Sequence, residues 1–377
     1  MNPWQGRGKS AFAVVLLFAA GAAVWARAAE QLALPEGFPL WQKSASVKVG
    51  LGYKDNVTLS SFDPQGSAFV AASLDAMLFR LPWHNWQLSL LAMGSDARYL
   101  DRFVGVDTEQ NAAVSGEFAW FAGKGWKCLS TLQYVFMNQV MDVSTTYGVS
   151  VRQQVFGHAL TVKEGVRKEA GWWWAGLDLS GTRSWFREPL DHSWQVGPQL
   201  ILGRYYGHGS ELSLSYQIAP LDYDTREQTD AAGTPIAGTH LQYLPQTVEL
   251  AWQHGWDEPR RWRNTLRLTF EANRDNAAGY YDYLMYRVGE QLRYRVGRWE
   301  VNVFASVAYN DFPHQAVGLN DPDPRHRTSA RLGLRAEWSL SRHWRVYAVY
   351  DYERSLSNLE VEQYDANTVS GGIEVAF

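Results

Sequence analysis

Serine and histidine side chains in the middle of the chain are the first candidates for chemistry. The segment from Ser180 to Glu188 has the sequence SGTRSWFRE, and His158 lies on the preceding predicted strand. A serine nucleophile needs a histidine base within hydrogen-bond reach. Alternation along a strand places Ser184 on the same face as Ser180, whereas His158 points to the opposite face. The spacing therefore argues against a serine hydrolase.

An acidic segment offers oxygen and nitrogen atoms that could bind a metal. Asp321, Asp323 and His326 fall within one long predicted loop over residues 314–327. These residues lack the regular ligand spacing of a calcium-binding loop, so a solvated acidic loop is the better interpretation. The other histidines are scattered along the chain. We expect no metal and no cofactor.

The strongest chemical pattern is a set of charged residues at every second position of apolar segments. In WRVYAVYDYE, for example, Arg345 alternates with Trp344 and Val346. This pattern suits a wall between hydrocarbon and water. The side chains expected to line a pore are Arg263, Arg267, Arg287, Arg293, Arg295, Arg331, Arg335, Arg345, Glu117, Asp178, Glu249, Glu271, Glu300 and Glu337.

The charges on this inward face allow two interpretations. Arginines dominate the later segments, whereas the earlier ones add inward Asp75 and Glu211 together with Lys48, Lys54 and Lys163. An arginine-rich wall opposite a more acidic one would orient polar solutes in a water-filled bore. Alternatively, the charges neutralise each other in pairs inside a plugged barrel. Both interpretations stay open at the sequence level.

The elements that carry these residues are alternating segments of about ten residues. Sixteen of them follow one another from Ser44, joined alternately by short and long connections. An even number of strands with both termini on the short-turn side is typical of transmembrane barrels. The sequence therefore predicts an all-β fold, a closed antiparallel transmembrane β-barrel over residues 44–377, with 14 or 18 strands as alternatives.

Composition agrees with a barrel in a membrane. Aromatic residues make up 14% of the chain although the mean hydropathy is -0.31, because lipid-facing and lumen-facing residues cancel. The formal charge of -4 gives no electrostatic reason to bind nucleic acid. Tryptophans crowd the short turns and are expected to form an interface girdle: Trp83, Trp86, Trp120, Trp126, Trp172, Trp252, Trp299, Trp338 and Trp344.

The beginning of the chain predicts export. Arg7 and Lys9 precede an apolar stretch, and the small residues Ala26 and Ala28 suit cleavage after Ala28. We expect a signal peptide over 1–28, a short periplasmic segment over 29–43, Sec-type export and a final location in the outer membrane of a Gram-negative cell. The single cysteine, Cys128, cannot form an internal disulfide.

The end of the chain resembles outer-membrane proteins as a class. The last strand alternates Ile373, Val375 and Phe377 against smaller or polar residues. In outer-membrane barrels a terminal Phe on such a strand is a recognition signal for the barrel-assembly machinery. The resemblance implies that this machinery, periplasmic chaperones and outer-membrane lipids are partners of the chain. Pairing of the last strand with the first would leave no exposed edge.

Further resemblances are confined to short segments. GLGYKDNVTLS, at Gly50 to Ser60, resembles the first strand of the putative β-barrel porin type 2 group, in which a G-x-x-Y-D-x-N-V motif opens the barrel. The size of the barrel is similar to the barrel domain of surface lipoprotein assembly modifiers. The segment SGTRSWFRE is similar to the region after the catalytic serine in outer-membrane phospholipases, but the N-G-x-S stretch of that family is missing.

The sequence thus predicts a porin-like passive channel for small polar or charged solutes. The alternative is a non-conducting barrel that aids export or assembly of a surface polymer or lipoprotein, and an outer-membrane lipase is less favoured. One residue does not fit the pattern, because alternation places Glu290 on the lipid-facing side. Gly289 beside it is a candidate for a local irregularity.

Overall fold

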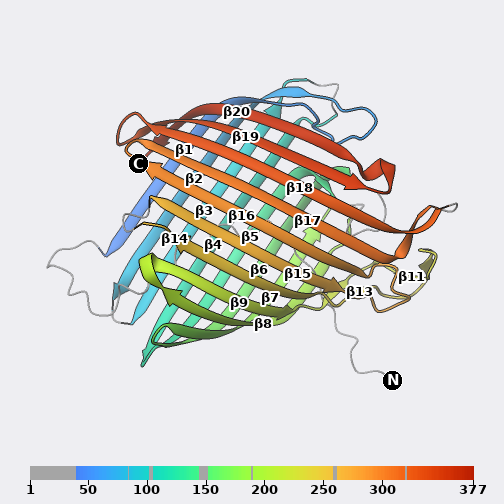
Figure 1. The fold of residues 1–377 in the computed structure, drawn as a ribbon, viewed down its shortest axis with the longest axis horizontal. Helices are drawn as coiled ribbons and strands as arrows, with labels where there is room; N and C mark the ends of the chain where they lie inside the picture. Colours follow the sequence, from blue (N-terminus) through green and yellow to red (C-terminus); the bar gives the residue numbers. More distant parts are fainter. Residues whose placement is uncertain are drawn as a thin grey trace.

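The chain forms a closed antiparallel barrel (Figure 1). The computed structural model describes residues 40–377 apart from 84, 102–104, 144–151, 188–189, 258–260 and 319–320. The sheet in these residues contains 18 strands, of which β10 (Leu221–Tyr223) and β13 (Gln242–Tyr243) are short pieces within one long connection. The other sixteen make the wall, which confirms the predicted strand number.

The wall strands follow one another around the barrel in chain order. They are β1 (Trp41–Lys54), β2 (Ser67–Trp83), β3 (Trp86–Tyr99), β4 (Thr108–Gly123), β5 (Trp126–Asp142), β6 (Arg152–Ala170), β7 (Trp173–Phe186), β8 (Ser193–Tyr206), β9 (Ser210–Ile218), β14 (Gln246–Gly255), β15 (Trp262–Asn273), β16 (Tyr283–Val296), β17 (Trp299–Gly318), β18 (Asp321–Ser339), β19 (Trp344–Ser357) and β20 (Tyr364–Ala376). The predicted signal peptide and most of the segment 29–43 lie outside the described residues.

The barrel closes between its first and last strands. β1 pairs with β20 from Ser46↔Ala376 to Lys54↔Thr368. The backbone N–H of Phe377 then donates to the carbonyl of Ala45 at 2.8 Å. Glycines allow the two strands to approach closely, since a Cβ at Gly372 would lie 2.1 Å from the Val49 carbonyl oxygen. The sheet therefore has no open edge at the chain ends.

Side chains alternate between the two faces of the wall as the sequence predicts. On β1 the exposed side chains of Val47, Val49 and Leu51 share one face, which continues on β20 as Val369 and Ile373. Apolar side chains dominate this outer face on the other strands as well. The charged residues that alternate with them, such as Arg331 and Arg335 on β18, lie on the opposite, inner face. Among the described residues, no helix has the length and apolar content to cross a membrane.

Connections are short at one end of the barrel and mostly long at the other, named here the short-turn end and the long-loop end. Positive φ angles at Asn85, Lys124 and Gly171 mark tight turns at the short-turn end. The prediction of a long loop over 314–327 is wrong. β17 extends to Gly318 and β18 starts at Asp321, so these residues prolong a hairpin with register shifts after Phe312.

The connection between β9 and β14 continues the wall at the long-loop end. β10 pairs with β8, and β13 pairs with β10. Pro220 and Pro245 interrupt the strands at the two junctions, because proline has no N–H to donate to a neighbouring strand. Within the same connection, β11 (Gln228–Thr229) and β12 (Pro235–Ile236) form a small separate hairpin.

Glu290 lies on the outer face, as its parity requires, and the structure shows how it is held. Asn264 on β15 shares that face and donates from Nδ2 to Glu290 Oε1 at 3.1 Å. The strand register runs without a shift through Gly289, so the expected irregularity there is wrong. A second outward carboxylate, Glu164, accepts a hydrogen bond from Ser130 Oγ at 2.6 Å. A polar neighbour on the adjacent strand thus accompanies each carboxylate.

Candidate functional site

The inner face of β16–β20 carries a ladder of ion pairs, most of which join neighbouring strands. Arg293 Nε lies 2.8 Å from Glu300 Oε1, and Arg295 Nε donates to the same carboxylate at 2.8 Å. Arg335 Nε donates to Glu337 Oε1 at 2.5 Å. Further pairs join Arg345 Nη1 to Glu374 Oε1 at 3.3 Å and Arg331 Nη2 to Glu353 Oε1 at 2.9 Å. These pairs run along the wall and leave the bore uncrossed.

The arginines of this ladder are more exposed than their carboxylates. The side chain of Arg331 is 61% exposed against 30% for Glu353, and that of Arg345 is 40% exposed against 4% for Glu374. A side chain that points inward and stays exposed must border open space within the barrel. The surface facing this space is therefore rich in guanidinium groups, and Glu300 alone is shared by two arginines, Arg293 and Arg295.

On the first two strands the order of exposure is reversed, whereas the pair on β6 and β7 keeps the order seen in the ladder. Lys48 on β1 pairs with Asp75 on β2, and Asp75 is the more exposed partner, at 41% against 17%. On β6 and β7, Lys163 Nζ lies 2.5 Å from Asp178 Oδ2, and Asp178 is buried. The part of the wall beside β20 thus exposes at least one carboxylate, Asp75, to the bore.

The remaining predicted pore residues occupy the same inner face with weaker contacts. Arg267 Nε lies 3.9 Å from Glu249 Oε1. Glu271 accepts hydrogen bonds from Tyr283 and from Thr247, and Arg287 Nη2 lies 3.3 Å from the sulfur of Met285. Arg263 is in register with Arg293, and Glu117 with Thr131. That these side chains line a conducting pore stays a prediction.

Among the ion pairs described, those that cross the barrel all lie near the long-loop end. Arg327 Nη2 on β18 lies 2.8 Å from Asp142 Oδ2 at the end of β5, and both side chains are buried. Six strands separate β5 from β18 on the shorter way around the wall. Lys54 on β1 likewise reaches Glu109 on β4, with 3.5 Å between Nζ and Oε1. We call this crossing region the mouth.

The end of β5 enters the mouth because it loses one of its neighbours. Pairing with β4 stops at Asn138, whereas pairing with β6 continues to Asp142. Val140 packs against the cluster of Leu59, Tyr364 and Ala366, and its N–H donates to Glu109 Oε1 at 3.1 Å. Strict alternation with Leu132 and Tyr134 would place Asp142 outside, so the sequence alone could not identify this residue.

The connection between β1 and β2 packs at the long-loop end, and its D-N-V segment makes most of the contacts. Asp55 accepts hydrogen bonds from the N–H and the side-chain amide of Asn367 on β20, both at 2.7 Å. Asn56 is buried and donates to the Ser60 and Asp365 carbonyls at 2.9 and 3.0 Å. Val57 is fully buried against Val106. The segment thus ties the loop to the seam of the barrel.

Tyrosines surround a half-buried arginine in the connection between β9 and β14. The Arg226 guanidinium lies 4.5 Å from the ring centre of Tyr281 and 5.0 Å from that of Tyr223. Burial raises the pKa of Tyr243 well above its usual value, so this phenol stays neutral at physiological pH. Arg226 is therefore held by cation–π contacts with neutral rings.

The predicted girdle tryptophans lie near the short-turn end. Trp299 and Trp338 stack with ring centres 5.9 Å apart, and the Arg80 guanidinium lies 3.4 Å above the ring of Trp86. Several of the rings are exposed: Trp120, Trp126, Trp172, Trp299, Trp338 and Trp344. Trp252 is half-buried and stacks on His254. The side chain of Trp83 lies outside the described part of the chain.

No candidate nucleophile or metal ligand set is assembled in the described residues. Ser184 is fully buried on the inner face, whereas His158 lies on the outer face, opposite Trp185. Asp321 and Asp323 alternate with His326 along β18, and no group of three potential ligands that could hold a metal occurs in this part of the chain. A serine–histidine contact missed from the sequence, Ser210 Oγ to His254 Nδ1 at 3.1 Å, has a fully buried serine.

Comparisons with known proteins agree on the architecture. No protein-family profile matches the chain. No curated protein sequence matches it either. The crystal structure of Pseudomonas aeruginosa OccK9 (OpdG) is similar over 89% of this chain and 99% of its own, with 8% identity and a TM-score of 0.50.

Two further structures are similar at lower scores. The BenF-like porin from Pseudomonas fluorescens Pf-5 has 7% identity and a TM-score of 0.49, covering 89% of this chain and 99% of that one. CdiB from Acinetobacter baumannii has 13% identity and a TM-score of 0.44, and the match covers 89% of this chain but only 60% of CdiB. At 8% identity, the likeness to OccK9 shows the fold alone, which is that of a closed β-barrel.

Proposed function

We propose that the protein is an outer-membrane barrel that acts as a porin-like passive channel for small polar or charged solutes. The main support for a channel is the ladder on β16–β20, where the arginines on the inner wall are more exposed than the carboxylates they pair with. Sixteen strands are enough for an aqueous passage. The apolar outer face and the export signal expected over residues 1–28 support the outer membrane as its location.

The channel is tested by reversing charge on the ladder. Purified protein in planar bilayers should conduct in steps, and Arg331→Glu with Arg335→Glu should shift the reversal potential in a salt gradient toward cation preference. The reason is that fixed charge on a low-dielectric wall sets the local ion concentration. The observable is the cation-to-anion permeability ratio.

Outward neighbours on the same strand supply the control. Leu332→Val and Leu334→Val should leave the permeability ratio unchanged, because these exposed side chains lie on the apolar outer face. A conducting barrel whose ratio ignores the double arginine reversal would show that these arginines do not border the conduction path.

The mouth favours a second candidate, a non-conducting barrel that aids export or assembly of a surface polymer or lipoprotein. The crossing pair between Arg327 and Asp142 and the packed Val57 loop obstruct the long-loop end. Absence of conductance from well-folded, heat-modifiable protein would favour this candidate over the channel.

The chain end supports a separate prediction about assembly. Phe377→Asp should reduce the amount of heat-modifiable barrel in the membrane several-fold, because the resemblance of the terminus assigns this ring to recognition by the assembly machinery. The ring is 74% exposed, so it adds little to the packing of the folded barrel. The yield of membrane-inserted protein is measured beside Thr234→Ala, a change in an exposed loop.

The unfolding temperature of the assembled Phe377 variant distinguishes a loss of recognition by the assembly machinery from a loss of stability of the folded barrel. Its unfolding temperature should match that of the unchanged protein, whereas its yield falls. Equal yields of the Phe377 and Thr234 variants would contradict a signalling role for the terminal residue.

A further inference from the structure

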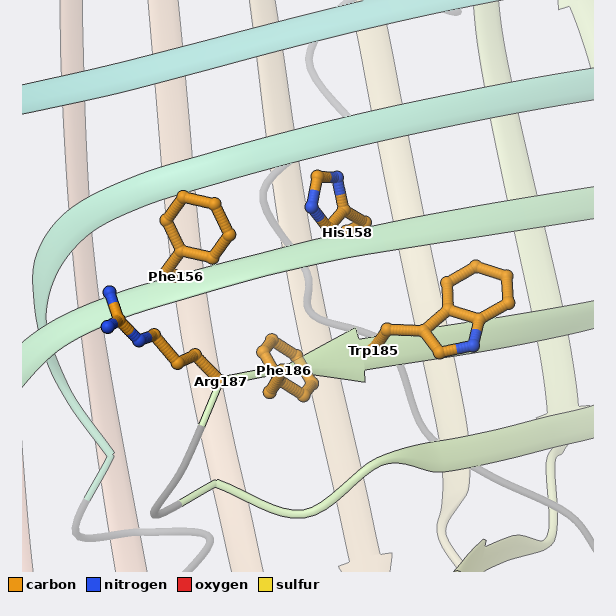
Figure 2. A pocket seen from close by; sticks show the side chains of 5 residues that line it. All are labelled: Phe156, His158, Trp185, Phe186 and Arg187. Carbon is orange, nitrogen blue, oxygen red and sulfur yellow. The ribbon is translucent and has the colours of Figure 1, made fainter.

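A pocket lies on the outer face of the barrel near the long-loop end. Its volume is about 310 Å³, and it is lined by Phe156, His158, Trp185, Phe186 and Arg187. Figure 2 shows Phe156 and His158 on one strand, Trp185 on the neighbouring strand, and Arg187 just beyond that strand's end. The pocket thus combines large rings with one cation at the rim of the apolar face.

Neighbouring aromatic residues hold the rings of the pocket in place. A hydrogen bond joins Tyr134 Oη and His158 Nδ1 at 2.6 Å, and Phe136 meets Phe156 edge to face with 5.4 Å between ring centres. Fixed rings of this kind, with an apolar body and a polar edge, favour the zone where lipid chains meet headgroups. The pocket is therefore placed for a ligand with both parts.

The charge at the pocket is positive. Arg187 is exposed, and no ion pair joins it to a carboxylate within the described residues. The nearby Arg183 is neutralised, since its Nη1 and Nη2 donate to the two oxygens of Asp224 at 3.2 and 2.6 Å. Asp224 is in turn committed to Arg183 and does not oppose an anion at Arg187. A guanidinium offers phosphate a strong, charge-assisted pair of hydrogen bonds.

The outer face below the pocket is mainly aliphatic, with the outward carboxylate Glu164 in register with Leu179. Leu160 and Val162 continue the outward side of β6 beyond His158, and Leu177 and Leu179 do the same on β7. These side chains are exposed and lie closer to the middle of the wall than the pocket does. Acyl chains of a lipid whose headgroup lies at Arg187 would cover them, with a gain of about 25 cal/mol per Å² relative to water.

We propose that this pocket binds the phosphorylated, acylated glucosamine headgroup of lipopolysaccharide, the glycolipid of the outer leaflet. Arg187 binds a phosphate, the rings of Phe156 and Trp185 pack on the sugar, and the aliphatic face receives the acyl chains. The proposal rests on the outer-membrane location proposed above, which places the long-loop end outside the cell, and it is independent of conduction.

A second pocket of similar volume offers a matched control at the opposite rim. Arg204, Tyr206, Leu212 and Trp252 line it, and Arg204 lies two residues from the short-turn end of β8. It too presents one arginine among aromatic rings, with the Arg204 guanidinium 5.3 Å from the ring centre of Trp173. The two pockets differ in the membrane leaflet that they face.

The experiment measures retention of purified lipid A by the full-length barrel in detergent, using native mass spectrometry. Arg187→Gln should weaken binding of lipid A about tenfold, the loss of roughly one charge-assisted contact. Arg204→Gln should leave binding of lipid A unchanged. Phosphatidylglycerol and dephosphorylated lipid A serve as comparison ligands and should bind at least as weakly as lipid A binds to the Arg187 variant.

The outcomes separate this proposal from the proposed function. Equal affinity of the unchanged protein and the Arg187 variant, or equal binding of phosphatidylglycerol and lipid A, would overturn the lipid site. Bilayer conductance is recorded on the same preparations and should be the same for both variants. A barrel that does not conduct but loses lipid A with Arg187→Gln would contradict the channel and leave the lipid site intact.

Discussion

Asp142→Arg is expected to open the mouth and raise single-channel conductance by about twofold, because the crossing pair with Arg327 becomes a repulsion. Both side chains are buried, and removing one partner of a buried pair costs about 3–5 kcal/mol. β5 has no β4 partner beyond Asn138 to hold its end in place. Conductance in planar bilayers and the heat-modifiable shift on gels are the measurements.

The exchanged pair is the control for this effect. Asp142→Arg combined with Arg327→Asp restores opposite charges across the mouth and should return conductance toward that of the unchanged protein. If the single variant folds normally and conducts as the unchanged protein does, the pair does not limit the passage, and the mouth would have to be controlled by the Val57 loop.

Glu362→Gln is expected to loosen the long-loop end of β17 and β18, at a cost of about 3 kcal/mol. Arg325 and Glu362 are both almost completely buried, with Arg325 Nη2 2.5 Å from Glu362 Oε1. Gln315 and the ring of Phe312 complete the surroundings of the guanidinium. The variant leaves this charge uncompensated. Amide hydrogen exchange should therefore become faster in residues 312–327.

An exposed neighbour in the same turn provides the comparison. Glu360 belongs to the 3-10 turn η4 (Glu360–Glu362) and is exposed, so Glu360→Gln should leave hydrogen exchange unaltered. Exchange elsewhere in the wall should be unaffected by either change, since the strand ladders do not depend on this pair. Unchanged protection of residues 312–327 in the Glu362 variant would contradict an anchoring role.

The strand number and the two faces of the wall could be predicted from sequence because apolar and polar residues alternate with a period of two. This alternation persists even in segments whose residues have a weak preference for strands. Arg331 and Leu332, for example, are assigned to opposite faces by parity alone. The clustering of Trp residues at the short turns is also visible in the sequence, whereas their role as an interface girdle stays a prediction. These features depend only on residues adjacent in sequence or in the next hairpin.

The mouth could not be predicted, because it depends on contacts between distant strands and on departures from alternation. Asp142 has outward parity along β5, yet it reaches Arg327 once the strand end leaves β4. The hairpin of β17 and β18 contains Pro322 and Pro324, which indicate a loop in sequence but occupy the end of a strand. The polar neighbour of Glu290, Asn264, is 26 residues away in sequence. It could be identified only once the pairing register of β15 and β16 is known.

The difference between pairs that follow the wall and pairs that cross the bore has an electrical consequence. Ions passing the ladder on β16–β20 break no contact, because each arginine stays bonded to a carboxylate of the same section of wall. Resistance in a conducting barrel is therefore concentrated at the mouth. A series resistance placed at one end and lined by fixed charge makes current depend on the sign of the voltage. The current–voltage curve would report which end of an inserted barrel faces the positive electrode.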